Sequence, residues 1–295
     1  PPPPPPPPPP LSMSMPRLQS AAFGMTMLAS ACLNNVFVSY YFEMFTEIAR
    51  VSTTWFFLGQ AVFCVWNCGN DVLFGWMSDK AQCRCRRCCW INDGGGGGWI
   101  GGGGGRAHRS RSSSPVAHGL ARRLRAIEVG GPIWVVAFVC VFWWPFDARA
   151  ASAMLTGLYC MFALCFYDGM LTFVEINHSA LLADMTTSSA ERARANMYSS
   201  ICAAIGSTSS FFAHTFWAPE DLAPFRTFCC VLGLVACTGF WFTVRFIDLA
   251  SIKRQTAAMR DGIVKPAVVT PTTRASSVLN KKNAEASRLL AKVTA

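Results

Sequence analysis

The chain has 295 residues, of which 52% are hydrophobic and 14% charged, and its formal net charge is +10 at pH 7. Soluble domains carry about 25% charged residues, so this composition, with a mean hydropathy of +0.31, indicates a membrane protein. The positive charge is better explained by a cytoplasmic membrane face than by nucleic-acid binding, so we expect a lipid bilayer and no nucleic acid among the partners.

The chain opens with ten prolines, and we predict a disordered Pro-rich N-terminus over residues 1–17. The first apolar stretch is too long for the central region of a cleavable signal peptide. We therefore expect the first membrane span itself to act as the insertion signal.

Six stretches lack charged residues over lengths close to the ~20 residues that a helix needs to cross ~30 Å of hydrocarbon. They cover residues 18–42, 51–70, 129–146, 150–167, 196–218 and 227–244. The sequence therefore predicts an all-α membrane protein with a domain of six transmembrane helices over residues 18–248.

A low-complexity insert at residues 81–118 interrupts this domain. It joins four cysteines, Cys83, Cys85, Cys88 and Cys89, to two pentaglycine runs. A structural zinc site needs a second pair of ligands after the first, and only glycine follows, so palmitoylation or sequence noise explains the cysteines better and no metal site is expected. A mistranslated intron and a genuine loop insertion both fit the glycine runs.

Lysine and arginine are distributed unevenly between the predicted connections. If the N-terminus is cytoplasmic, the inner segments hold Arg17, ten basic residues from Lys80 to Arg125, the 192–194 pair and the tail, and the outer loops hold Arg50, Arg149 and Arg226. The positive-inside rule then places both termini in the cytoplasm. Residues 249–295 are predicted to form a basic disordered cytoplasmic tail.

Ionisable groups inside a span usually face a polar cavity or a partner. Asp71 closes the second span, with Asn67 at i−4 on the same helical face. Asp168 and Glu175 lie two turns apart on one side of the fourth helix, followed by His178. These groups could bind a small cation or exchange a proton. Structural alternatives remain open: Asp71 could cap the helix, Asp168 could accept a hydrogen bond, and His178 could be a donor near the helix end.

The stretch "GWMSDK", with Gly75, Asp79 and Lys80, resembles the start of the motif that joins the second and third helices in the major facilitator superfamily. The resemblance implies that the glycine permits close helix packing and that the charges form a latch on the cytoplasmic side. The next glycine of the motif is absent, and the insert stands in place of the short basic turn.

The stretch "WNCGNDVLFGWMSD" resembles more narrowly the glycoside, pentoside and hexuronide cation symporters, the melibiose carrier group. The resemblance places Asn67 and Asp71 at two acidic cation-ligand positions, with an amide replacing the first carboxylate. A second match, "FVEINHSALLADMTTSSAER", places Glu175 at an acidic cation-site position and aligns Glu191 and Arg192 with a loop pair. The phrases "LNNVFVSYY" and "WNCGNDVLFGW" are closer still to the orphan branch named transmembrane protein 180.

The resemblance implies a secondary-active carrier of a small polar solute, sugar-like in the relatives, coupled to a monovalent cation. Two carboxylates and an amide suit H⁺, or weakly bound Na⁺, and no other cofactor is expected. Asn34, Asn35 and Asp168 are candidate solute-cavity residues. Six helices make one half of the superfamily fold, so we expect a second six-helix half, in cis or as a dimer.

The alternative is a membrane scaffold or accessory protein that keeps the fold without transport. An enzyme is not expected, because neither a nucleophile with a positioned base nor a phosphate-binding loop is present. The plasma membrane is the favoured location.

Overall fold

The computed structural model describes residues 15–93, 115–147, 150–186 and 188–248, with side chains except at 78–93 and 115–118. The chain divides into two units, Ser14–Arg254 on the one hand and Pro1–Met13 with Gln255–Ala295 on the other. The described helices belong to the first unit. The predicted tail at 249–295, residues 1–14 of the predicted N-terminus and the glycine runs of the insert lie outside the described residues.

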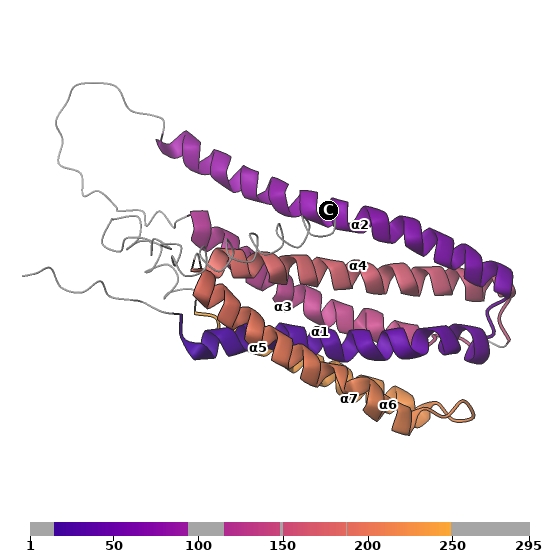
Figure 1. Cartoon of the computed structure of the whole chain (residues 1–295). Helices are drawn as coiled ribbons and strands as arrows, with labels where there is room; N and C mark the ends of the chain where they lie inside the picture. The colour runs from indigo at the N-terminus through magenta and orange to yellow at the C-terminus, as the bar shows by residue number, and fades with distance from the viewer. Residues whose placement is uncertain (1–14, 94–114, 148–149, 187, 249–295) are drawn as a thin grey trace, which may run out of the picture. The chain divides into compact units, whose positions relative to one another are not determined.

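The regular structure of the described residues is entirely helical, and no strand occurs among them. The elements, shown in Figure 1, are α1 Arg17–Glu43, the π-helical turn η1 Met44–Ile48, α2 Thr53–Asp93, α3 Pro115–Phe142, α4 Ala153–Met185, α5 Ser189–Ser207, α6 Ser209–Phe216 and α7 Ala223–Phe246.

Local sequence signals account for several of the helix starts. Helix α1 begins directly after Pro16. Ser152 precedes α4, and its hydroxyl oxygen accepts a hydrogen bond from the backbone N–H of Leu155 at 3.3 Å, which satisfies a donor that the helix leaves free. Pro224 lies in the first turn of α7, where its missing N–H costs no helical hydrogen bond.

Within the described residues, four helical stretches are long and apolar enough to cross a membrane: Arg17–Ile48, Gly119–Phe142, Ala153–Met185 and Ala223–Phe246. They correspond to the first, third, fourth and sixth predicted spans. The fourth helix continues to Met185, well past the predicted end at Tyr167. Asp168 and Glu175 therefore lie inside this helix.

The second and fifth predicted spans are helical but are not among these four stretches. Helix α2 carries the polar residues Gln60, Asn67 and Asn70, which lower its hydropathy. Helix α5 begins with a charged segment and is interrupted at Thr208 before α6 continues. The six-span arrangement therefore stays a prediction.

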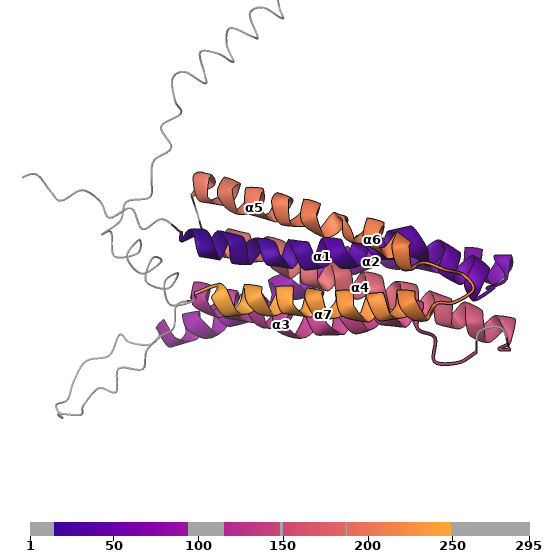
Figure 2. The ribbon, with the colours of Figure 1, turned by 90° about the horizontal axis from the view of Figure 1, so that it is seen from below.

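Helix pairing follows a regular scheme. Helix α1 packs along α5 and α7, α4 packs along α2 and α3, and α3 packs along α7. Figures 1 and 2 both show α5 beside α1. Let α5 and α6 count as one helix, and let α1, α2 and α3 correspond to α4, α5 with α6, and α7. Exchanging each helix for its counterpart then turns every packed pair into another packed pair of the same list.

Close backbone approach holds α1 between its two neighbours. A Cβ on Gly206 of α5 would lie 2.6 Å from the carbonyl oxygen of Leu28, and one on Gly239 of α7 would lie 3.0 Å from that of Met25. A Cβ at Gly206 would clash with the backbone of α1, and one at Gly239 would require α1 to move by a few tenths of an ångström. Small residues of this kind are typical of helix contacts inside membranes, where backbones approach closely.

Aromatic side chains fill the centre of the helix bundle. Tyr167 of α4 stacks on Phe37 of α1 with ring centroids 3.8 Å apart. Trp134 of α3 lies 6.0 Å from the Tyr167 ring and 5.9 Å from the Phe240 ring of α7. All of these side chains are buried, and they fix the relative positions of α1, α3, α4 and α7.

Basic residues gather at one end of the bundle. The N-termini of α1, α3 and α5 and the C-termini of α2, α4 and α7 meet at this end, on the left in Figure 1. The described basic residues near it are Arg17, Arg122, Arg123, Arg125, Arg192, Arg194 and Arg245. Arg50 and Arg226 belong to the opposite end, which fits the predicted orientation without testing it.

Candidate functional site

A buried polar contact joins α2 to α4. The side-chain amide Nδ2 of Asn70 donates to Oδ2 of Asp168 at 2.5 Å, and the two residues are 1% and 7% exposed. One turn earlier on α2, the ring of Trp66 lies against Gly169, 3.1 Å from where a Cβ would stand. Asp168 thus faces α2, and its nearest polar partner is an amide.

Asn70 received no role from the sequence, although a signal was present. Gly59, Phe63, Trp66 and Asn70 recur at helical spacing and form the face of α2 that is at least half-buried. Asn67 and Asp71 fall on the neighbouring face. Extending the helical spacing of Gly59, Phe63 and Trp66 by one more turn would have placed Asn70 on the inward face of α2.

A second polar contact joins α1 to α4. The hydroxyl of Ser30 donates to Oε1 of Glu175 at 2.7 Å, and Glu175 is half-buried. Further along the same two helices, the Tyr167 hydroxyl donates to Oδ1 of Asn34 at 3.4 Å. Glu175 and Asn34 therefore both lie on the α1–α4 contact.

His178 extends this contact. Its Nε2 donates to the backbone oxygen of Phe23 at 2.9 Å, and its ring stacks on the Phe23 ring with centroids 4.0 Å apart. The side chain is buried, so His178 fastens α4 to α1 inside the bundle. His178 is thus a hydrogen-bond donor, but it lies inside α4 and not near its end, and its partner is on α1.

Asn67 and Asp71 lie on an exposed face of α2. Among the described residues neither forms a hydrogen bond with Glu175. Asp71 does act electrostatically on Asp168, so two carboxyl groups from α2 and α4 lie near one another.

The two candidate asparagines of α1 contact different helices. Asn34 meets Tyr167 of α4, as described above. Asn35 donates from Nδ2 to the carbonyl oxygen of Ala31 at 2.8 Å and to the hydroxyl of Ser207 at 3.1 Å, so it faces α5. Asn34 alone of the pair belongs to the α1–α4 contact.

The predicted latch motif is described only in part. A Cβ on Gly75 would have no heavy atom within 4 Å, so the close packing expected at this glycine does not occur within the described part of the chain. Asp79 and Lys80 lie on the backbone of α2, but their side chains lie outside the described residues. The cysteines at positions 83, 85, 88 and 89 do so as well.

Glu191 and Arg192 bind the start of α5 to neighbouring backbone. Glu191 accepts hydrogen bonds from the Thr186 hydroxyl at 2.5 Å and from the backbone N–H of Met15 at 2.6 Å. Arg192 donates from Nε to the carbonyl oxygen of Thr186 at 2.9 Å, and Arg194 donates to that of Met15. Glu191 and Arg192 thus anchor the turn before α5, and Glu191 with Arg194 also holds Met15, two residues before the start of α1.

An ion pair that the sequence did not indicate joins α3 to α4 at the same end. Arg123 Nε lies 2.6 Å from Asp184 Oδ2, and both side chains are largely buried. Neither residue belongs to the predicted latch motif, which stays a prediction.

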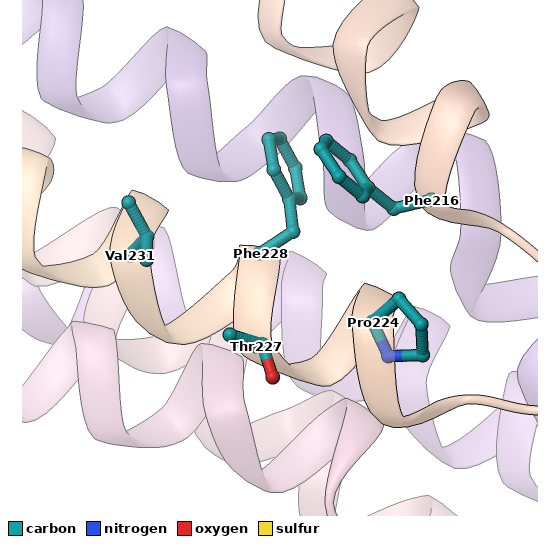
Figure 3. A pocket seen from close by; sticks show the side chains of 5 residues that line it. All are labelled: Phe216, Pro224, Thr227, Phe228 and Val231. Carbon is teal, nitrogen blue, oxygen red and sulfur yellow. The ribbon is translucent and has the colours of Figure 1, made fainter.

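The cavities of the described residues lie apart from these contacts. Figure 3 shows one of ≈ 360 Å³ between α6 and α7, lined by Phe216, Pro224, Thr227, Phe228 and Val231. Another, of ≈ 500 Å³, lies between η1, the α3–α4 connection, the α6–α7 connection and the start of α7. Neither is lined by a predicted site residue. Among the described residues, no group of three or more His, Cys, Asp or Glu side chains could hold a metal ion.

Comparison with known proteins gives two informative relatives. The chain is 35% identical over 241 residues to mouse Transmembrane protein 180, a match that covers 82% of this chain and 40% of the relative. It is 33% identical over 225 residues to the chicken protein of the same name, covering 76% of this chain and 38% of the relative. The matched region thus spans about two fifths of these curated relatives. No protein-family profile and no solved structure matches the chain.

Proposed function

We propose that the described helices form one half of a secondary-active carrier, in which carboxyl groups of α2 and α4 bind a proton or another monovalent cation that is coupled to a small polar solute. One observation carries the proposal. Glu175 lies inside a helix apolar enough to span a membrane, and its carboxylate is met by the hydroxyl of Ser30. An ionisable side chain inside a membrane-spanning helix is costly to insert. Such groups usually face a partner or a water-filled cavity and mark the pathway of an ion or solute.

The neighbouring polar groups support this interpretation. Asn34 lies on the same α1–α4 contact, and Asp168 with Asn70 lies on the α2–α4 contact. Polar side chains of three helices are thus concentrated around α4. Hydroxyl, amide and carboxylate oxygens are suitable groups for hydrogen-bonding a polar solute and for binding a proton or small cation.

The helix-pairing scheme supports a carrier fold. Exchange of α1, α2 and α3 for α4, α5 with α6, and α7 preserves the pairs, as expected for two three-helix repeats. Carriers with such repeats bind solute and ion near the bilayer midplane. We propose a major facilitator superfamily half with both termini in the cytoplasm.

The exposed face of α2 supports the need for a second half. Asn67 and Asp71 are exposed there, and a carboxylate exposed to lipid is unfavourable. The curated relatives extend well beyond the matched region. A second six-helix half, in cis or as another copy, would cover this face. From the family resemblance we further propose that the solute is sugar-like and that the protein lies in the plasma membrane.

The test is uptake by proteoliposomes holding the chain together with a second half, with a pH-sensitive dye inside and a panel of monosaccharides and glycosides outside. Glu175→Gln and Asp71→Asn should abolish solute-driven cation entry without reducing protein incorporation. Glu128→Gln, at an exposed position of α3, is the matched control and should keep full uptake. Uptake that survives Glu175→Gln would reject the proposal and favour a non-transporting scaffold.

A further inference from the structure

Asn70 of α2 and Asp168 of α4 form a buried contact between an amide and a carboxyl group. We propose that Asp168 binds a proton, that this proton is present in the conformation described, and that Asn70 is the hydrogen-bond partner of the protonated acid. The protonation is inferred from the α2–α4 contact alone. Its assignment as the coupling ion rests on the carrier function proposed above.

Hydrogen-bond accounting requires a donor at this contact. Asn70 donates from Nδ2 to Asp168, but its buried Oδ1 accepts no hydrogen bond from the described residues. An ionised carboxylate can only accept, whereas a protonated one also donates. A proton on Asp168 therefore allows the acid and the amide to form two hydrogen bonds to each other, and Oδ1 is then satisfied.

Protonation of Asp168 is also required if the side-chain amide of Asn70 is flipped by 180°, so that Oδ1 and Nδ2 exchange places. Amide oxygen and nitrogen are assigned from their surroundings, so the atom 2.5 Å from Asp168 Oδ2 could equally be the oxygen of Asn70. Two acceptor oxygens at that distance require a proton between them. In the first orientation the proton gives the buried Oδ1 of Asn70 a hydrogen bond, and in the second it supplies the hydrogen bond that joins the two oxygens.

The surrounding charges disfavour the ionised form. Asp71 of α2 is the charged group that acts electrostatically on Asp168, and it repels the ionised form, whereas the nearby Tyr167 and Cys165 of α4 are neutral at neutral pH. From α1 and α3, Asn34 and Trp134 face Tyr167, and neither is charged. No described Lys or Arg forms a salt bridge with Asp168.

Loss of the proton changes the packing of α2 on α4. A carboxylate at Asp168 would be buried, would face an amide that can donate only from Nδ2, and would be repelled by Asp71. Buried charges without a partner are strongly unfavourable. Release of the proton should therefore weaken the α2–α4 contact, which is the behaviour expected of a site that couples ion binding to helix movement.

Infrared spectroscopy of the full chain in phosphatidylcholine vesicles tests the site. The wild-type chain at neutral pH should show the carbonyl stretching band of a protonated carboxylic acid in an apolar environment. Asp168→Asn should remove this band, while Glu128→Gln, a carboxyl-to-amide control at an exposed position of α3, should leave it. Asn70→Leu should keep the band and move it toward the frequency of an acid with fewer hydrogen bonds.

The outcomes separate this site from the proposed function. Absence of the band in the wild-type chain, or its persistence in Asp168→Asn, overturns the proposal. If Asp168→Asn fails to fold, an unshifted band in Asn70→Leu overturns it instead. A band that behaves as expected in a chain that catalyses no uptake with a second half would support the proton site and reject the carrier function.

Discussion

Arg123 Nε and Asp184 Oδ2 lie 2.6 Å apart and join the start of α3 to the end of α4. The two side chains are 7% and 19% exposed, so the pair is partly removed from solvent. A largely buried charge that loses its partner is costly, because the remaining ion is poorly hydrated. This contact should therefore contribute measurably to the packing of the end of the bundle at which basic residues gather.

We expect Arg123→Gln and Asp184→Asn each to destabilise the protein, and the double substitution to cost less than their sum. The coupling energy should be about 1 to 3 kcal/mol, as for contacting partners in other proteins. Unfolding in detergent, followed by circular dichroism, measures it. Additive single effects would mean that the two residues do not act as a pair.

Gly206 is expected to tolerate no side chain. A Cβ there would lie 2.6 Å from the carbonyl oxygen of Leu28, so Gly206→Ala should separate α5 from α1 and cost about 1 to 3 kcal/mol. Gly69→Ala is the matched control, because no heavy atom lies within 4 Å of its Cβ position. The control should be neutral or gain up to about 1 kcal/mol through helix propensity. Equal unfolding midpoints for the two variants would contradict the close α1–α5 approach.

Thr243 links α7 to α1 through a buried hydroxyl. It accepts a hydrogen bond from the Thr26 hydroxyl at 2.9 Å and donates to the backbone oxygen of Ala22 at 2.7 Å. Thr243→Val keeps the shape and removes both bonds, which should cost about 1 to 2 kcal/mol.

Thr238→Val provides the control on the same helix. The Thr238 hydroxyl is exposed and donates to the carbonyl oxygen of Leu234 within α7, so its loss should change the unfolding midpoint little. Thermal unfolding of both variants in the same detergent gives the comparison. A larger effect at Thr238 than at Thr243 would mean that the α1–α7 hydrogen bonds contribute no stability.

The orientation in the membrane follows from the basic end of the bundle. An Asn-x-Ser/Thr glycosylation acceptor inserted between α6 and α7, within residues 217–222, should be modified when the chain is made in endoplasmic-reticulum membranes. The same acceptor placed between α4 and α5, at residues 186–188, should not be modified, because the positive-inside rule assigns that end to the cytoplasm. A gel-mobility shift reports modification, and the opposite pattern would invert the topology.

Much of the helix arrangement could be predicted from the sequence because uncharged length is a direct signal of a spanning helix. The windows ending at Phe42 and Val244 anticipated α1 and α7 closely, since charged residues flank them. The interruption at Thr208 could not be predicted this way, because no charge or proline marks it and Gly206, two residues earlier, leaves the hydropathy of the window unbroken.

The candidate site was harder to predict because it depends on which helices touch. The sequence singled out the acidic residues inside predicted spans, but hydropathy does not say which face of a helix meets which neighbour. Arg123 and Asp184 are 61 residues apart, and Asn70 and Asp168 are 98 apart. Contacts of that sequence separation follow from tertiary packing of α2 and α3 on α4, which no local pattern specifies.

The exposed face of α2 leads to the last prediction. Cys64 and Cys68 lie on α2 beside Asn67 and are exposed, so a membrane-permeant maleimide should modify both in the isolated chain. If a second half covers this face, adding the part of mouse Transmembrane protein 180 that lies outside the matched region should slow their modification. Cys237, half-buried on α7, serves as the control and should react at the same rate with and without the added part. Mass spectrometry of the modified peptides measures each rate. Equal protection of all three cysteines would indicate a global change in packing. Unchanged modification rates at Cys64 and Cys68 would show that this face of α2 is not the docking surface.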